Sequence, residues 1–159
     1  MSQSGNAVNL ETSMGYLIKE VSVALRIAME EVLRPLGMSV THYSCLELLA
    51  QRPGLSNSDL ARGTFVTRQS MNVLLQALER DGFVTRPAGA RVGRILPAQL
   101  TADGRAQLEK ATVAVHSVEL RMLNDLTDVE RETAFRVLRQ MVWSLQSCAD
   151  VDGPVAEPI

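Results

Sequence analysis

Apolar residues recur at helical spacing in long segments near both ends of the chain. From Glu11 to Arg34 they lie three or four positions apart, until a proline and a glycine end the pattern. A second long pattern begins at Thr101, and another begins at Thr127, where Glu130 completes a Thr-x-x-Glu capping box. These segments predict three long amphipathic helices.

Three shorter helical patterns lie between the long ones. Thr41 is predicted to cap the first, which stops at an Arg-Pro-Gly sequence, and Ser56 the second, in the run SNSDLARGT. Thr67 is predicted to cap the third after a turn of only a few residues, and Asp81-Gly82 ends it. Two short helices joined by so tight a turn predict a helix-turn-helix.

The third short helix separates apolar from polar side chains around its axis. Met71, Leu74, Leu75 and Leu78 cluster on one side, and the opposite side carries Arg68, Gln69, Asn72, Val73 and Gln76. Arginine can bind guanine with two hydrogen bonds, asparagine or glutamine can bind adenine likewise, and valine methyls can meet a thymine methyl. This side of the helix is therefore a candidate for reading base edges.

A short β-hairpin is predicted after this helix. Phe83-Val84-Thr85-Arg86 has the β-branched and aromatic bias of a strand, residues 87–94 are rich in turn formers, and Ile95 to Leu100 returns as a second strand. Pro97 restricts the return strand to an edge or a bulge. The hairpin has the shape of a wing, and Arg91 and Arg94 at its tip suit a narrow minor groove.

The charge distribution supports a surface that faces a polyanion. The whole chain carries a net charge of -2, but residues 55–97 carry +3 and the remainder -5. The six basic residues of this segment are all arginines: Arg62, Arg68, Arg80, Arg86, Arg91 and Arg94. A locally positive segment in an acidic protein is typical of nucleic-acid recognition on a soluble scaffold.

Length and composition favour a cytoplasmic protein with one core. At 159 residues and 46% hydrophobic content the chain can bury a single core, and the long helices carry more apolar surface than a small winged unit can cover, which predicts a homodimer. Neither a membrane span nor a signal peptide is recognisable, so no membrane partner is expected. Cys45 and Cys148 lie far apart without Cys-x-x-Cys spacing and are expected to stay reduced.

The run LARGTFVTRQSMNVLLQALERDGFVTR resembles the reading unit and first wing strand of the MarR (multiple antibiotic resistance regulator) family of winged helix-turn-helix transcription factors. Leu100-Thr101-x-x-Gly104 is similar to the family's junction into its fifth helix. The wing departs from the family pattern, because Val92 replaces the aspartate that commonly braces the wing arginine and Pro97 is atypical. Arg94 retains the wing arginine.

The resemblance implies a mainly α (α+β) fold and a homodimeric, ligand-responsive repressor of a pseudo-palindromic operator. The domain is predicted at residues 11–149, with the winged helix-turn-helix at about 41–100, dimerisation helices at about 11–34 and 101–149, and flexible tails at 1–10 and 150–159. Contacts with double-stranded DNA are predicted for Ser56, Arg62, Thr67, Arg68, Gln69, Ser70, Asn72, Val73, Gln76, Arg86, Arg91 and Arg94.

Family members often bind small aromatic acids, so the resemblance also implies a phenolic or aromatic effector. The candidate lining residues are Tyr16, Leu17, His42, Tyr43, Leu46 and Met71. For each of them an ordinary place in the core or in the dimer interface is an equal alternative. No cofactor is predicted, and no metal site either, since the two histidines have no acidic or cysteine companions at ligand spacing.

Two alternatives to the ligand-responsive repressor stay open. In the first, the winged surface serves protein contacts without DNA. In the second, Cys45 makes the protein a redox-sensing regulator, although a buried structural cysteine is favoured at that apolar position. An enzyme is not predicted, because the chain has no nucleophile elbow, P-loop or dinucleotide fingerprint.

Overall fold

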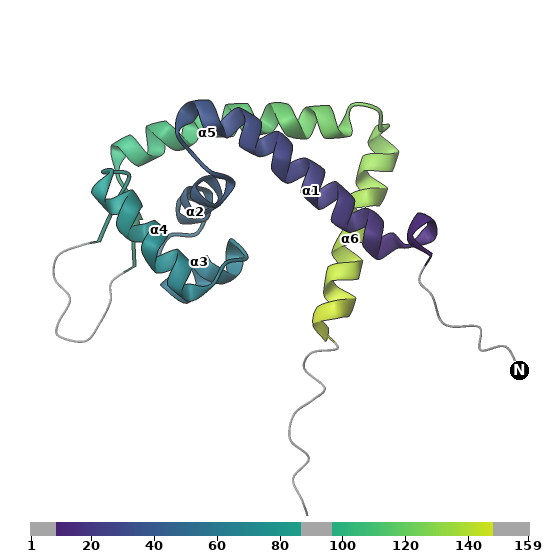
Figure 1. The fold of residues 1–159 in the computed structure, drawn as a ribbon, viewed down its shortest axis with the longest axis horizontal. Helices are drawn as coiled ribbons and strands as arrows, with labels where there is room; N and C mark the ends of the chain where they lie inside the picture. The colour runs from purple at the N-terminus through teal and green to yellow at the C-terminus, as the bar shows by residue number, and fades with distance from the viewer. Residues whose placement is uncertain (1–8, 87–96, 148–159) are drawn as a thin grey trace, which may run out of the picture. The chain divides into compact units, whose positions relative to one another are not determined.

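A computed structural model describes residues 9–86 and 97–147, which fall into two compact units, one ending at Glu119 and one beginning at Leu120 (Figure 1). Antiparallel pairing joins the two short strands, with Val84 opposite Leu100 and Thr85 opposite Gln99. In chain order the elements are η1 (Leu10–Thr12), α1 (Met14–Leu33), η2 (Arg34–Leu36), α2 (Val40–Gln51), α3 (Asn57–Gly63), α4 (Arg68–Arg80), β1 (Val84–Thr85), β2 (Gln99–Leu100), α5 (Ala102–Leu123) and α6 (Asp128–Ser147). This confirms the mainly α winged helix-turn-helix predicted from the sequence, while the predicted domain boundaries stay a prediction.

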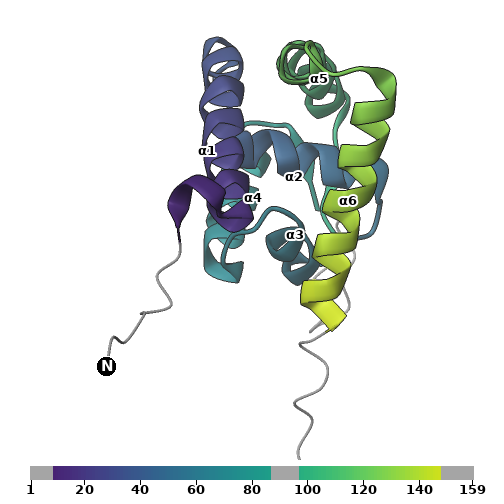
Figure 2. The same ribbon diagram turned by 90° about the vertical axis from the view of Figure 1, so that its right-hand side faces the viewer.

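The first unit builds its core from side chains that converge from α1, α2, α3 and α4. Leu33, Leu46, Leu60 and Met71 are each 0% exposed. Figures 1 and 2 show α2 between α1 and the pair formed by α3 and α4, in agreement with the contacts that α2 makes with both α1 and α3. The core thus lies directly behind the helix-turn-helix and holds its two helices from one side. We call residues 40–86 and 97–100 the winged head.

Ser39, not Thr41, caps the start of α2. The Ser39 hydroxyl accepts a hydrogen bond from the His42 backbone N–H at 3.2 Å, and His42 Nδ1 accepts one from the Ser39 backbone N–H at 3.4 Å. The prediction of Thr41 was wrong. Ser39 and Thr41 are both hydroxyl residues near the start of the apolar pattern, but the His42 imidazole completes a reciprocal capping box only with Ser39.

The wing is shorter in the described residues than the sequence predicted. Phe83 lies outside β1 because its N–H bonds the Leu78 carbonyl at 2.9 Å. It is therefore part of the motif that follows the end of α4, in which Gly82 takes the left-handed position (φ +80°). Pro97, which has no N–H to donate, lies outside β2. The tip, with Arg91, Val92 and Arg94, lies outside the described residues.

The Leu-Thr-x-x-Gly sequence anchors α5 to the base of the wing. Thr101 donates its hydroxyl to the Gly82 carbonyl at 2.6 Å and accepts the Gly104 N–H at 3.0 Å. Gly104 lies so close to Phe83 that a Cβ atom built on it would be 2.0 Å from the Phe83 carbonyl oxygen. The glycine is therefore required by the close approach of two backbones.

Large apolar side chains remain exposed on the long helices of the single chain. On α1 they include Met14, Leu17, Val21 and Ile27, and α6 has no buried residue. No helix among the described residues has the length and apolar content needed to span a bilayer. The exposed apolar surface agrees with the prediction that these helices pack against a second subunit.

Candidate nucleic-acid interface

The recognition helix α4 begins and faces solvent as the sequence predicts. Thr67 accepts the Ser70 backbone N–H on its hydroxyl at 3.1 Å and donates its own proton to the Ser70 hydroxyl at 2.9 Å. Leu74 is the most exposed residue of the apolar side, at 8%. The opposite side is exposed, and we call it the reading face: Arg68, Gln69, Asn72, Val73 and Gln76.

The turn between α3 and α4 is a Schellman motif with an unusual residue. The Val66 N–H bonds the Ala61 carbonyl at 3.0 Å and the Phe65 N–H bonds the Arg62 carbonyl at 3.2 Å, which are the two hydrogen bonds of that motif. Phe65 occupies the left-handed position (φ +58°), where glycine is usual, and is 95% exposed. The tight turn therefore carries a strained and solvated aromatic residue.

The start of α3 is held by a reciprocal network. Ser56 and Asp59 cap each other, and Arg62 pairs with Asp59 at 2.9 Å. The hydrogen bonds from Ser56, with a smaller contribution from Arg62, lower the pKa of Asp59. Because the Ser56 backbone N–H already bonds Asp59, a phosphate at this helix start would have to use the other groups there.

A cavity of about 340 Å³ lies between the start of α3, α4 and the base of the wing. Arg68 and Arg86 line it together with the polar side chains of Ser56 and Asn72, and Leu75 adds apolar surface. Arg86 is partly exposed and lies 3.8 Å from Glu79. The cavity thus combines two guanidinium groups with an apolar wall, which suits a small anion that has an apolar body.

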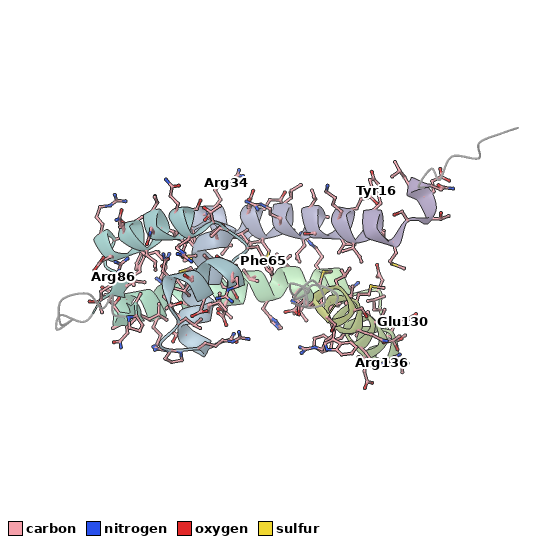
Figure 3. The ribbon with its side chains drawn as sticks, turned by 90° about the horizontal axis from the view of Figure 1, so that it is seen from below. Tyr16, Arg34, Phe65, Arg86, Glu130 and Arg136 are labelled. Carbon is pink, nitrogen blue, oxygen red and sulfur yellow. The ribbon has the colours of Figure 1, made fainter. Side chains whose placement is uncertain are left out.

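The six residues predicted to line an effector site lie in three different settings in the first unit. Leu46 and Met71 are fully buried in the core. Tyr16 and Leu17 line a separate hollow beside η1, and Figure 3 shows Tyr16 and Arg86 at opposite ends of this unit. His42 and Tyr43 are half-buried at the start of α2, where His42 serves as a capping residue.

Cys45 is a core residue. It is 0% exposed, its thiol lies 3.8 Å from the Met71 sulfur, and burial raises its pKa to about 12. A neutral, enclosed thiol is a poor nucleophile toward peroxide. Cys148 lies outside the described residues.

The described residues show one contact in the interface that the sequence reasoning missed. The side-chain amide of Asn57, the first residue of α3, donates to the Asn72 side-chain oxygen at 2.8 Å. The two residues are fifteen positions apart, and helical periodicity says nothing about which side chains of two different helices meet. Within the same residues no group of three or more His, Cys, Asp or Glu side chains is placed to hold a metal ion.

Comparison with known proteins finds one consistent relationship. A family model described as MarR family matches residues 36–95. The HTH-type transcriptional repressor Rv2887 of Mycobacterium tuberculosis (strain ATCC 25618 / H37Rv) is 40% identical over 131 residues, which cover 82% of this chain and 94% of that protein.

Two solved structures of that mycobacterial protein are similar to the described fold. The complex of Rv2887 with salicylic acid is 41% identical, covers 82% of this chain and 96% of the solved chain, and gives a TM-score of 0.70. The complex of Rv2887 with DNA is 38% identical, covers 82% and 98%, and gives a TM-score of 0.69.

Proposed function

The chain belongs to the MarR family, and on that premise we propose that it is a homodimeric transcriptional repressor that a small aromatic acid releases from its operator. The observation that carries the proposal is the exposed reading face of α4, which follows a tight turn and is backed by a buried apolar side. Two such helices in a dimer reach successive major grooves about 34 Å apart, so the operator is pseudo-palindromic.

Within this proposal the interface residues have two kinds of role. Arg62, Arg86, Thr67 and Ser70 position the winged head on phosphates, and the reading face contacts base edges. Ser56, also predicted to contact DNA, gives both of its donors to Asp59. Arg91 and Arg94 of the wing contact the minor groove, as the sequence predicts.

The proposed effector site is the cavity between α3, α4 and the base of the wing. A carboxylate there pairs with Arg68 or Arg86, and its aromatic ring packs on Leu75. The mycobacterial relative was solved with salicylic acid, an anion of this chemistry. Because the same arginines are proposed to face DNA, a bound anion competes for them and lowers the affinity for the operator.

Selection of bound fragments from genomic DNA tests the proposal, followed by affinity measurements at several salt concentrations. We expect an enriched pseudo-palindrome whose affinity falls steeply as salt rises, because binding releases counterions from the phosphates. A winged-helix dimer that serves only protein contacts would give no enriched sequence and no specific salt-sensitive complex.

Single variants assign the roles. Arg68→Ala or Gln69→Ala should relax preference at particular bases, by about 1–3 kcal/mol for each lost bidentate contact, whereas Arg94→Ala should weaken binding to all sequences. Equal losses on every sequence for Arg68→Ala and Gln69→Ala would contradict base readout.

Calorimetric titration with salicylate in the absence of DNA locates the effector. The double variant Arg68→Gln/Arg86→Gln should abolish binding if the cavity holds the carboxylate, and Tyr43→Phe should leave binding unchanged. The reverse result would favour the lining predicted from the sequence, with His42 and Tyr43. Oxidation tests the redox alternative, since a Cys45 sensor would release DNA with peroxide in the native protein but not in Cys45→Ser.

A further inference from the structure

The side chain of Asn57 ties the first helix of the helix-turn-helix to the second. Its Nδ2 donates to the Asn72 Oδ1 at 2.8 Å and lies 3.5 Å from the Arg68 backbone carbonyl in the first turn of α4. Asn57 is partly buried beside the cavity, and Asn72 is exposed on the reading face. A side chain behind the interface thus contacts one that faces outward.

The orientation of both amides follows from the Arg68 carbonyl. A backbone carbonyl only accepts hydrogen bonds, so the NH₂ end of the Asn57 amide faces it. The other hydrogen of that NH₂ group is then donated to Asn72, which accepts it on Oδ1. The Asn57 Oδ1 is enclosed and finds no hydrogen-bond partner among the described residues, so it does not compete for the Asn72 amide.

This orientation changes what Asn72 presents to a base. A free asparagine can bind adenine by accepting from N6 and donating to N7 at the same time. In this chain the oxygen of Asn72 is turned toward Asn57, and its NH₂ group is the end left for a ligand. The exposed end of the side chain is a donor. It matches guanine and thymine, whose polar major-groove groups are all acceptors, better than adenine, where N6 would be left without an acceptor.

We propose that Asn57 is a positioning residue that sets the base preference of Asn72 by holding its amide with the NH₂ group toward DNA. This inference rests on the proposed function, because it assumes that α4 enters the major groove. A contact that only joins α3 to α4 would instead affect stability and would weaken binding to all sequences alike.

Exchange of hydrogen-bond polarity at position 57 provides the test. Asn57→Asp keeps the size of the side chain and places an acid in the first turn of α3, where it is favourable. It loses the long contact with the Arg68 carbonyl and offers only acceptors to Asn72. The Asn72 amide should then turn its NH₂ group inward and its oxygen outward. At one base position in each half-site we expect preference to move from guanine or thymine to adenine or cytosine, by about 2- to 10-fold in relative affinity, because a single end of the amide makes the contact.

Two further variants test whether the change in base preference depends on the Asn72 amide. Asn57→Ser is too short to reach Asn72, so it should relax preference at that one position without reversing it. In an Asn72→Ala background, Asn57→Asp should leave the relative affinities at that position unchanged, because no amide remains to turn. Since these readouts compare sequences for one variant, a uniform loss from the added negative charge cancels.

Affinity selection with libraries randomised over the half-site distinguishes the outcomes. An unchanged base profile in both Asn57→Asp and Asn57→Ser, with the native protein selecting its operator normally, would overturn the role of Asn57 and leave the proposed function intact. If Asn57→Asp does not fold, the profile of Asn57→Ser decides alone. If the native protein enriches no sequence, the proposed function fails, and this inference fails with it.

Discussion

Helices α4 and α6 are both amphipathic, but they differ in what their apolar residues contact. In α4 the apolar side is buried within the chain, with Met71 at 0% and Leu75 at 3% exposure. In α6, which is longer by seven residues, no residue is buried, and Trp143 is 69% exposed. The apolar side of α4 is covered by its own chain, whereas the apolar residues of α6 remain exposed.

The difference indicates that the winged head determines the stability of the fold and that α6 serves the assembly of the proposed dimer. The winged head shares a buried core with Leu33 of α1 and with Leu108 and Ala111 of α5, so its fold depends on packing within the single chain and on its caps. The apolar surface of α6 gains its stabilisation only when another surface covers it, and a second copy of the chain supplies that surface in the proposed dimer. Substitutions in the two regions should therefore have different signatures.

Gly104→Ala should give the largest loss, in the stability of the winged head. The added methyl meets the Phe83 carbonyl oxygen at 2.0 Å, and a backbone atom cannot move aside as a flexible side chain can. We expect the free energy of unfolding to fall by about 3 kcal/mol, measured by urea denaturation at a fixed protomer concentration.

Gly15→Ala is the matched control. Gly15 lies in α1 with no atom closer than 4.0 Å to the added methyl, so alanine should raise stability by up to about 1 kcal/mol. Equal effects of the two substitutions would contradict the close approach of α5 and Phe83.

Leu138→Glu should act on assembly and leave the winged head folded. Leu138 is 50% exposed on α6 and shares one side of that helix with Phe135, Val142 and Leu145. A charge in the proposed dimer interface should weaken association by about 2 kcal/mol or more, seen as dissociation in analytical ultracentrifugation. Gln140→Glu adds the same charge on the opposite side of α6 and should leave the dimer intact; dissociation by both variants would refute this assignment of the interface.

Phe65→Gly should raise the stability of the winged head modestly. Glycine adopts the left-handed conformation of this turn without the steric cost that Phe65 meets, and the exposed ring has little packing to lose. We expect a gain of about 0.5–1 kcal/mol in the free energy of unfolding. Phe65→Ala removes the ring but keeps the Cβ atom, so it should gain nothing, and a gain equal to that of glycine would show that the ring causes the strain.

The smallest effect should be a pH dependence from His42. Burial lowers its pKa below the usual 6.5, an effect that Asp81 partly opposes. Since the unfolded chain then binds the proton more readily than the folded one, stability should fall as the pH drops below about 6.5 and level off once the folded form is protonated too. Urea denaturation from pH 7.5 to 5.5 measures this slope. His42→Gln, which keeps a capping-box residue without titrating, should flatten it; an unchanged slope would place its origin elsewhere.

Much of the interface was predictable because it is local. The caps at Ser56 and Thr67 depend on residues three positions apart, and the polarity of α4 follows from its 3.6-residue period. The cap of α2 was misplaced because Ser39 and Thr41 are equivalent by composition, and only the hydrogen bonds of the His42 backbone and imidazole with Ser39 separate them. The assembly of Arg68, Arg86 and Asn72 around one cavity was not predictable, because it depends on how α3, α4 and the wing pack.

The sequence by itself determined the order of the helices, the side of α4 that faces solvent and the excess of apolar residues on the long helices, because hydrophobic period and capping chemistry act over a few residues. Only the tertiary structure decided that Asn57 contacts the amide of Asn72 and that Gly104 must lack a side chain, whereas the burial of Cys45 confirms what its apolar surroundings predicted. The first two depend on the distance between segments far apart in the chain, and packing of the core sets those distances.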